Sequence, residues 1–272
     1  MKVKSLEKTD SSEIITCFLK AFENYYIQFP TDPDYFRKRW RDAGVRYDLS
    51  YGMFDGDKLV GFIIHAVDHR VGKLTAHNTG TGVLPEYRGR KFVDKIYEFA
   101  IPDLRRNGIK KTTLEVVTKN TSAIKVYKRT GFSISKTYKC FKGSFFHKPQ
   151  RPEGLTEVLP GLFDWSLLAD QSRYSWDNHR KSIQNGNYKF FILGRQIPLA
   201  AFIINPETGY IPQVHCLKND EKTWEDLFEA IASVSSEIKI NNVDIQEEGK
   251  IRQLKRAGLI NHIDQFEMER II

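Results

Sequence analysis

The sequence predicts an α/β fold that is present twice in the 272-residue chain. Three observations predict it. Helix and strand patterns alternate along the first half, a stretch with Pro and Gly separates the halves, and short sequences of the first half return in the second in the same order. Hydrophobic residues make up 40% and charged residues 28% of the chain, which is typical of a globular protein and excludes disorder, collagen and coiled coil.

The first half begins with helix and hairpin signals. Asp10 is a capping residue followed by a carboxylate, Glu13, in the first turn, and apolar residues then recur at helical spacing. A second helix is expected after residues 30–33. Residues 53–60 place a Gly/Asp turn between two strand runs, which predicts a β-hairpin whose second strand continues to His65.

The remaining elements of the first half alternate between strand and helix. They are expected as strands at residues 74–83, 111–117 and 133–141, and as helices at residues 91–106 and 121–129. Asn107-Gly108 and Thr130-Gly131 close the two helices, because Gly just past a helix end adopts the left-handed conformation that stops the helix.

Two short sequences recur in the second half. Gly61-Phe62-Ile63-Ile64 is echoed at residues 201–204, and Lys128-Arg129-Thr130-Gly131-Phe132 is echoed at residues 255–259. Each pair lies at the matching place in a hairpin or at a helix end, which favours two copies of one fold over two unrelated α/β segments.

A candidate linker lies between the copies at residues 147–155, which include Pro149, Pro152 and Gly154. We therefore predict one domain over residues 1–145 and a second over residues 146–272.

Positive charge is concentrated in the first half. Residues 1–145 hold 27 Lys and Arg against 16 Asp and Glu, a net charge of +11, whereas residues 146–272 hold 15 against 18, a net charge of −3. A basic domain favours an anionic partner, such as a phosphate-bearing cofactor, nucleic acid or a membrane surface, although solvated lysines that keep the domain soluble give the same count. The sequence has none of the common nucleic-acid-binding motifs, so nucleic acid stays a minor alternative.

The cysteines and the apolar stretches bear on the compartment. Cys17, Cys140 and Cys216 are odd in number and widely spaced, which is typical of a reducing compartment and predicts neither a disulfide framework nor a metal site. The apolar stretches are far shorter than the ~18–20 residues that span a bilayer, and residues 1–8 are too charged for a secretory signal. We expect a cytoplasmic protein without a membrane partner.

The most informative stretch joins the end of one strand to the start of a helix: Gly82-Val83-Leu84-Pro85-Glu86-Tyr87-Arg88-Gly89-Arg90-Lys91-Phe92-Val93. Such a turn directs free backbone N–H groups and the positive end of the helix dipole toward one place. Gly89 permits close approach of the backbone, and Arg88, Arg90 and Lys91 add positive charge. The pattern favours pyrophosphate binding, with a basic surface turn as the alternative.

A second stretch follows downstream: Leu114-Glu115-Val116-Val117-Thr118-Lys119-Asn120-Thr121-Ser122-Ala123-Ile124-Lys125-Val126-Tyr127, and then Gly131-Phe132. Together the two stretches resemble the Gcn5-related N-acetyltransferase (GNAT) superfamily over residues 1–142. The resemblance implies a mixed central β-sheet flanked by helices. It also implies transfer of an acetyl group from acetyl-CoA to an amine.

One loop departs from the family pattern. The family loop usually reads R-x-x-G-x-G/A, and here the two small positions are occupied by Lys91 and Val93. A β-carbon there crowds the phosphates, while the Lys91 ammonium attracts them. We interpret the loop as a reshaped cofactor site.

The resemblance assigns a set of cofactor-binding residues. The main chain of Gly82 and Val83 would pair with the pantetheine arm, and the N–H groups of Val83 and Leu84 would polarise the thioester carbonyl. Asn120 would bind the pantetheine chain or a water, or act as a helix N-cap. The full set is Gly82, Val83, Leu84, Arg88, Gly89, Arg90, Lys91, Phe92, Val93 and Asn120.

Two side chains are candidates for the proton transfers. Tyr127 would be the general acid that protonates the leaving CoA thiolate, and a tyrosine packed in the core is the alternative. Glu115 would be the base for the substrate ammonium, as in the ribosomal-protein N-terminal acetyltransferases, which the segment also resembles; a solvated strand carboxylate is the alternative. His77, in the preceding strand, is a second candidate for a relay through water.

The second half lacks the matching chemistry. When the two helix ends are aligned, Leu254 takes the place of Tyr127 and Glu247 the place of Asn120. The basic turn is replaced by residues 218–221, so we expect a degenerate copy that has lost cofactor binding.

We therefore predict an acetyl-CoA-dependent N-acetyltransferase with one site in residues 1–145. A non-catalytic acyl-CoA-binding or sensing protein is the alternative. The acceptor, a small molecule or a peptide bearing a primary amine, and the oligomeric state remain open.

Overall fold

The computed structural model describes residues 1–146 and 151–272, which form two compact units. The first unit consists of Met1–Ser135 together with Phe266–Ile272, and the second of Lys136–Gln265. Residues 147–150 of the expected linker lie outside the described residues. The division expected at residue 145 assigned the last residues of the chain to the second half, whereas here they belong to the first unit.

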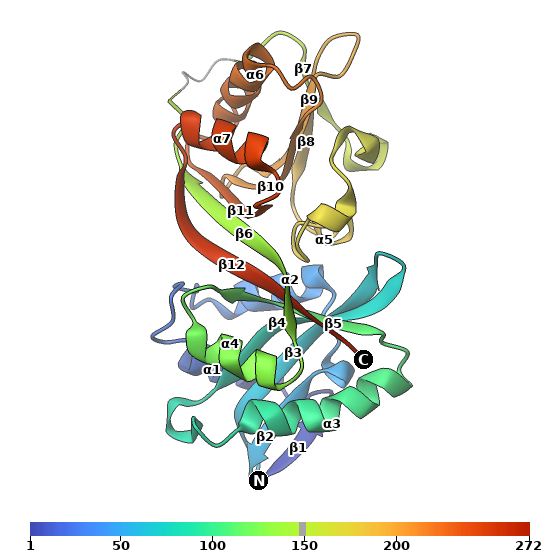
Figure 1. Cartoon of the computed structure of the whole chain (residues 1–272), viewed down its shortest axis with the longest axis vertical. Helices are drawn as coiled ribbons and strands as arrows, with labels where there is room; N and C mark the ends of the chain where they lie inside the picture. The colour runs from blue at the N-terminus through green and yellow to red at the C-terminus, as the bar shows by residue number, and fades with distance from the viewer. Residues whose placement is uncertain (147–150) are drawn as a thin grey trace. The chain divides into compact units, whose positions relative to one another are not determined.

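The first unit contains a mixed sheet, as the sequence predicts. Its strands are β1 (Lys2–Ser5), β2 (Tyr51–Asp55), β3 (Lys58–Arg70), β4 (Lys73–Val83) and β5 (Lys111–Val117), and they lie side by side in that order (Figure 1). The pairs from β1 to β4 are antiparallel, and β4 and β5 are parallel. The change of direction occurs because the chain crosses over through a helix between β4 and β5.

Four α-helices flank this sheet: α1 (Ser11–Ala21), α2 (Pro33–Ala43), α3 (Phe92–Arg106) and α4 (Thr121–Arg129). Asp10, Asp32 and Asn120 cap α1, α2 and α4 by accepting a backbone N–H with their side chains. The expected helix starting at Asp10 and the bounds expected for β5 and α4 are confirmed. The core cluster of this unit includes residues from all four helices.

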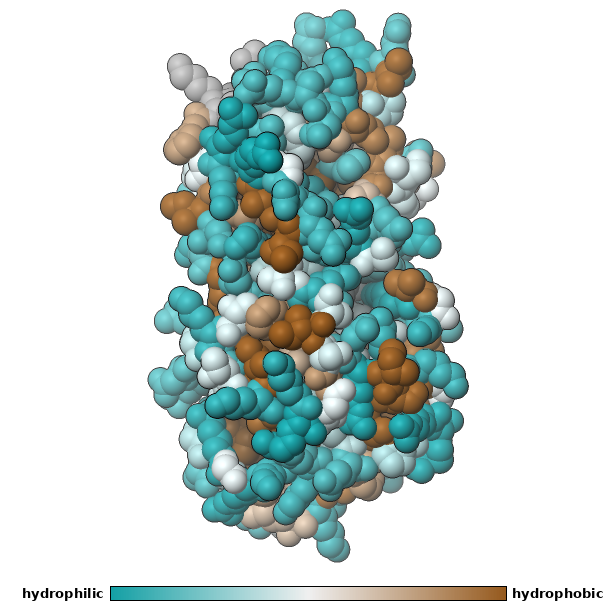
Figure 2. All heavy atoms as spheres, viewed as in Figure 1, coloured by the Kyte–Doolittle hydropathy of each residue, from teal (hydrophilic) through white to brown (hydrophobic). Residues whose placement is uncertain are grey.

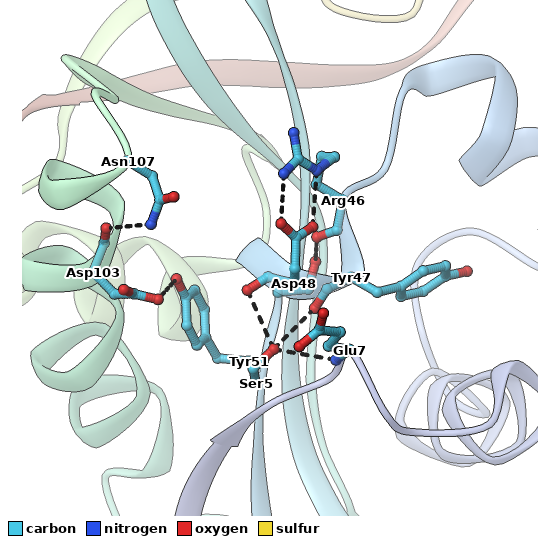
Figure 3. Close-up of polar contacts among 9 residues, drawn as sticks. Ser5, Glu7, Arg46, Tyr47, Asp48, Tyr51, Asp103 and Asn107 are labelled. Atoms are coloured by element: carbon cyan, nitrogen blue, oxygen red, sulfur yellow. Dashed lines mark hydrogen bonds and ion pairs between the residues drawn. The ribbon is translucent and has the colours of Figure 1, made fainter.

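Polar contacts join α3 to the sheet (Figure 3). The Tyr51 hydroxyl of β2 donates to Asp103 Oδ2 at 2.9 Å, and burial together with this carboxylate raises the pKa of Tyr51. Asn107 Nδ2 donates to the Asp103 backbone carbonyl at 2.9 Å, at the end of the helix. Beside them Arg46 pairs with Asp48 just before β2. The contact between Tyr51 and Asp103 anchors the C-terminal half of α3, whose N-terminus begins the candidate site.

The second unit repeats the order of elements. It contains β6 (Ser133–Gly143, largely in this unit), β7 (Leu155–Val158), α5 (Arg180–Gln184), β8 (Lys189–Leu193), β9 (Ala200–Asn205), β10 (Tyr210–Cys216), α6 (Glu221–Ala232), β11 (Ile238–Asp244), α7 (Glu248–Arg256) and part of β12 (Ile260–Ile271). The series β8-β9-β10-α6-β11-α7 matches β2-β3-β4-α3-β5-α4. The two echoed sequences lie in β3 and β9 and at the ends of α4 and α7.

The outer face shown in Figure 2 is mostly hydrophilic, with separate hydrophobic areas. Within the described ranges, no helix combines the length and apolar character needed to cross a membrane.

Candidate active site

The two central strands of the first unit separate at one end. β4 and β5 pair from Thr75 opposite Lys111 to Asn78 opposite Leu114, and both strands then continue past the last pair. At the same point β4 contains a bulge, because Ile64 and His65 of β3 face Gly80 and Asn78 and leave Thr79 between them as an extra residue. A bulge bends its strand, and β4 and β5 have no paired residues beyond Asn78 and Leu114. We call the region between these unpaired strand ends the opening.

The end of β4 directs part of its main chain into this opening. Leu84 N–H donates to the Val60 carbonyl at 3.0 Å, and Val83 faces Gly61 across the strands. Because hydrogen-bonded and non-hydrogen-bonded pairs alternate in an antiparallel ladder, the N–H and C=O groups of Thr81 and Val83 point away from β3 and toward the β5 side.

Gly82 and Leu84, which the sequence also assigned to cofactor pairing, direct their main-chain groups toward β3 instead. Gly82 is required for packing, because a Cβ there would lie 2.6 Å from the Phe62 ring and 2.7 Å from Ala21 of α1. The absence of a side chain at this position therefore lets α1 pack closely against the strand.

The turn after β4 leads into a helix start without a side-chain cap. Gly89 has a φ of +79°, and Lys91, the N-cap residue of α3, has a φ of +55°. Among the described side chains none caps α3, in contrast to α1, α2 and α4. Phe92 is buried and Val93 partly buried, which fixes the start of the helix. The backbone N–H groups of the first turn are thus available to an anion.

The three cations of the turn differ in what they contact. Arg88 donates to the Ala21 carbonyl at 2.9 Å and to the Val83 carbonyl at 3.3 Å, so its guanidinium joins α1 to β4. The Arg90 guanidinium stacks over the Tyr87 ring, 5.1 Å from the ring centroid. Lys91 is exposed at the start of the helix.

Asn120 has the capping role that the sequence left open. Its Oδ1 accepts the Ala123 N–H at 3.2 Å, at the start of α4. The Asn120 side chain also hydrogen-bonds the hydroxyl of Tyr25, and burial raises the pKa of this tyrosine. The neighbouring Tyr26 hydroxyl donates to the Lys119 carbonyl at 3.2 Å. The loop between α1 and α2 therefore lies against the start of α4. The sequence gives no signal for either tyrosine, because no spacing relates them to Asn120.

Tyr127 lies on the buried side of α4, with 8% of its surface exposed. Burial raises the pKa of its phenol to about 12, and a hydrogen bond with the Thr81 hydroxyl opposes this shift. The phenol therefore keeps its proton across the neutral pH range. Core packing and proton donation are both compatible with this position.

Asn78 organises the polar groups beside Tyr127 and was also missed. Its Nδ2 donates to Thr81 Oγ1 at 2.6 Å and to the Tyr97 hydroxyl oxygen at 2.9 Å, and its Oδ1 accepts the Gly80 N–H at 3.1 Å. Because Thr81 Oγ1 already accepts a hydrogen bond, its own proton is available to the Tyr127 oxygen.

Glu115 and His77 share one face of the sheet. His77 Nδ1 lies 3.0 Å from Thr113 Oγ1 of β5, and Glu115 follows Thr113 by two residues. Glu115 is partly exposed with its Oε1 buried, between the buried Leu114 and Val116 that face the other way. The carboxylate thus lies on β5 just past the last β4–β5 pair.

Residues 15–132 match the acetyltransferase (GNAT) family, and this span contains the opening, the turn and α4. Residues 15–132 form a GNAT acetyltransferase domain. Over 99 residues, 36% of this chain, the sequence is 28% identical to mycothiol acetyltransferase of Corynebacterium glutamicum strain R and 26% identical to N-alpha-acetyltransferase 30 of Schizosaccharomyces pombe. These matches span only 31% and 62% of the two relatives.

The fold of the whole chain is similar to that of a tandem GNAT protein from the clavulanic acid biosynthesis pathway. The TM-score is 0.67 at 12% identity, with 99% of this chain and 98% of that chain covered. This likeness confirms the expected α/β fold. The match of residues 15–132 to the family agrees with the expected resemblance to the GNAT superfamily.

The second unit differs from the GNAT domain at each position of the site. Asp220 Oδ1 caps α6 by accepting the Thr223 N–H at 2.8 Å, so a carboxylate lies where the GNAT domain leaves the N–H groups available. Leu254 is fully buried, and Glu247 forms an ion pair with Lys250 at 2.8 Å.

The second unit also fills its own strand opening. β10 and β11 pair at Tyr210 opposite Lys239, and beyond that pair Asn178 bridges the strands. Asn178 Nδ2 donates to the Asn241 carbonyl at 2.9 Å, and Gln213 Nε2 donates to the Asn178 carbonyl at 2.6 Å. A segment of the chain therefore lies where the GNAT domain has its opening.

Proposed function

We propose that the GNAT domain transfers an acetyl group from acetyl-CoA directly to a primary amine. One observation carries the proposal: the unpaired end of β4 leads through the basic turn to the uncapped N-terminus of α3, and Tyr127 is buried in the core of the same unit. An extended chain with a pyrophosphate at one end fits this arrangement, because main-chain groups of Thr81 and Val83 face the opening and N–H groups of α3 follow the turn.

The residues of the chain fit the cosubstrate. Acetyl-CoA supplies an activated thioester. Val83 N–H is directed toward the opening and would donate to the thioester carbonyl oxygen. The N–H groups that follow Lys91, together with the Lys91 and Arg90 cations, would hold the pyrophosphate, whereas Arg88 acts through the backbone of β4 and α1.

Two proton transfers belong to the proposal. Thr81 can donate to the Tyr127 oxygen, which leaves the phenolic proton free to be donated to the departing sulfur. Glu115 on β5, with His77 on the same face, would accept the proton of the attacking ammonium, directly or through water.

The acceptor is proposed only as a primary amine. The matched relatives are named for acetylation of mycothiol and of N-alpha groups, so both a small molecule and a peptide N-terminus belong in the test. Tyr25 and Tyr26 lie beside Asn120 and are proposed to contact the acceptor.

A non-catalytic acyl-CoA sensor is the second candidate, and Lys91 favours it. Lys91 has a β-carbon and adopts the left-handed conformation at the turn. The β-carbon restricts how closely the backbone can approach the phosphates of the cosubstrate.

Calorimetry with acetyl-CoA, followed by thiol release with a panel of small amines and peptides, tests these alternatives. We expect one acetyl-CoA bound per chain and turnover with at least one amine. Binding without turnover on any amine would support the sensor, and failure to bind CoA would reject both functions. A stoichiometry of two would contradict a blocked opening in the second unit.

A further inference from the structure

The last residues of the chain complete the catalytic unit. Phe266–Ile272 follow the second unit in the sequence but belong to the first (Figure 1). Met268 is fully buried in the same core cluster as Tyr127 and Phe132. Lys111 Nζ of β5 lies 3.2 Å from Glu269 Oε2, and Ile272 N–H donates to the Lys110 carbonyl at 3.1 Å.

One side chain of this segment reaches the helix that carries Tyr127. Arg270 Nη1 donates to the Thr130 carbonyl at 2.6 Å, at the C-terminal end of α4. Gly131 makes room for this contact, because a Cβ at this residue would lie 3.2 Å from Arg270 Nε. Gly131 also has a φ of +91°, so the glycine serves both the helix end and the arginine.

The contact is suited to fixing the last turn of α4. The last carbonyls of a helix lack partners within the helix and carry partial negative charge. A guanidinium that donates to one of them supplies the missing hydrogen bond and places a positive charge at the negative end of the helix dipole. The Tyr127 carbonyl in the same turn accepts Phe132 N–H at 2.9 Å and Thr130 Oγ1 at 3.0 Å. The backbone of Tyr127 and the carbonyl held by Arg270 thus belong to one hydrogen-bonded turn.

An ion pair also connects the end of α4 to the first turn of α3. Arg129 donates through two nitrogens to the two carboxylate oxygens of Asp94 in the first turn of α3, at 2.5 and 2.7 Å. The end of α4 is therefore held from two sides, by α3 and by the last strand of the chain.

We propose that Arg270 is a positioning residue for acetyl transfer: it holds the end of α4 so that the Tyr127 phenol keeps its place beside Thr81 and the strand opening. This inference rests on the proposed function only for its kinetic consequence. The structural consequence, a more mobile α4 when Arg270 is lost, is independent of any activity.

The test compares Arg270→Met with Glu269→Gln, a neighbouring change on the same strand that removes the pairing with Lys111 but touches no part of α4. Hydrogen exchange of the full chain reports on α4 directly. We expect faster exchange over residues 121–131 in Arg270→Met and wild-type exchange there in Glu269→Gln. Wild-type exchange in Arg270→Met would overturn the proposal.

The kinetic arm uses a double-mutant cycle with Tyr127→Phe. Since small misplacements of a catalytic group cost up to ~100-fold in rate, we expect Arg270→Met to lower kcat by about 10- to 100-fold with little change in KM for acetyl-CoA. In the Tyr127→Phe background the same change should have almost no further effect, because the group it positions is gone. Fully additive effects would reject the coupling.

Two controls are needed. The first detects a folding defect in the Arg270 variant, and the second detects a failure of the proposed function. Arg270→Lys keeps a cation that can donate to Thr130 and should recover part of the kcat if the chain folds normally. If the wild-type protein turns over no amine, the proposed function fails, and the exchange measurement alone decides the role of Arg270.

Discussion

The Arg88 guanidinium donates to the Ala21 carbonyl at 2.9 Å and thereby joins the end of α1 to the end of β4. The sequence placed Arg88 among the residues that bind the pyrophosphate. We propose from these contacts that Arg88 supports the shape of the site, since its Nε and Nη2 donate to two backbone carbonyls.

The substitution Arg88→Ala should therefore reduce stability as well as cofactor affinity. Loss of the two contacts is expected to lower the free energy of unfolding by about 1 kcal/mol, measured by denaturant titration. Arg90→Ala is the matched change, because Arg90 lies in the same turn but stacks on Tyr87. It should weaken CoA binding in low salt and leave stability unchanged. Equal stability of the two variants would contradict the assigned role of Arg88.

Tyr127→Phe should keep the affinity for CoA and lower turnover. The ring and its packing remain, whereas the proton donor is lost, and general acid catalysis typically contributes about 10²–10⁴-fold. Single-turnover kinetics with the best amine would measure the chemical step. An unchanged rate constant for that step would leave Tyr127 as a core residue.

Glu115→Gln should change the pH dependence of turnover. If the carboxylate accepts the ammonium proton, the rate of the wild-type enzyme rises with pH, and the variant loses rate mainly on the low-pH side. His77→Gln serves as the comparison, because His77 shares the face of the sheet and contacts Thr113. Superimposable profiles for Glu115→Gln and the wild type would transfer the role to His77 or water.

Lys91→Gly should raise the stability of the protein and leave its affinity for CoA little changed. Because Lys91 has a φ of +55°, glycine relieves the strain of a left-handed residue, and we expect a gain of about 1 kcal/mol in stability. For CoA binding, loss of the Lys91 cation weakens the attraction for the phosphates, whereas closer approach of the backbone strengthens it. Because these two effects oppose each other, the dissociation constant should change by less than about tenfold. The salt dependence of binding, measured by calorimetry, should become shallower. An unchanged salt dependence would show that Lys91 does not meet the phosphates.

The stability of the first unit should fall in mildly acidic solution because of His65. This histidine is fully buried, its Nδ1 lies 2.7 Å from the Leu49 carbonyl, and its Nε2 has no hydrogen-bond partner among the described residues. Burial lowers the pKa of His65 from 6.5 to about 4. The unfolded chain therefore binds a proton below pH 6.5 that the folded chain binds only near pH 4.

The free energy of unfolding should accordingly decrease as the pH falls from 6.5 to 4, by about 3 kcal/mol at most. Chemical denaturation at a series of pH values would measure this decrease. His65→Asn, which can still donate to the Leu49 carbonyl but does not titrate, should be less stable at neutral pH and show a smaller slope in this window. An identical slope would assign the pH dependence to other groups.

The sequence by itself determined the local elements of this protein. Capping at Asp10, the Gly-containing helix ends and the alternation of apolar residues depend on neighbours within a few positions, so the bounds of β5 and α4 follow from them. The resemblance to the GNAT superfamily depends on residues that are close together in the chain, and it led to Tyr127 and Asn120.

The tertiary structure decided which groups meet. The bulge at Thr79 sets which main-chain groups of β4 face the opening. A change of register by one residue would turn these groups toward β3 and turn those of the neighbouring residues toward the opening. Tyr25 reaches Asn120, and Arg270 reaches Thr130, from distant parts of the chain. Such contacts are absent from local patterns because they depend on how the loop after α1 and the last strand return to the sheet. Local spacing therefore predicts the elements of the site, and packing selects the side chains that complete it.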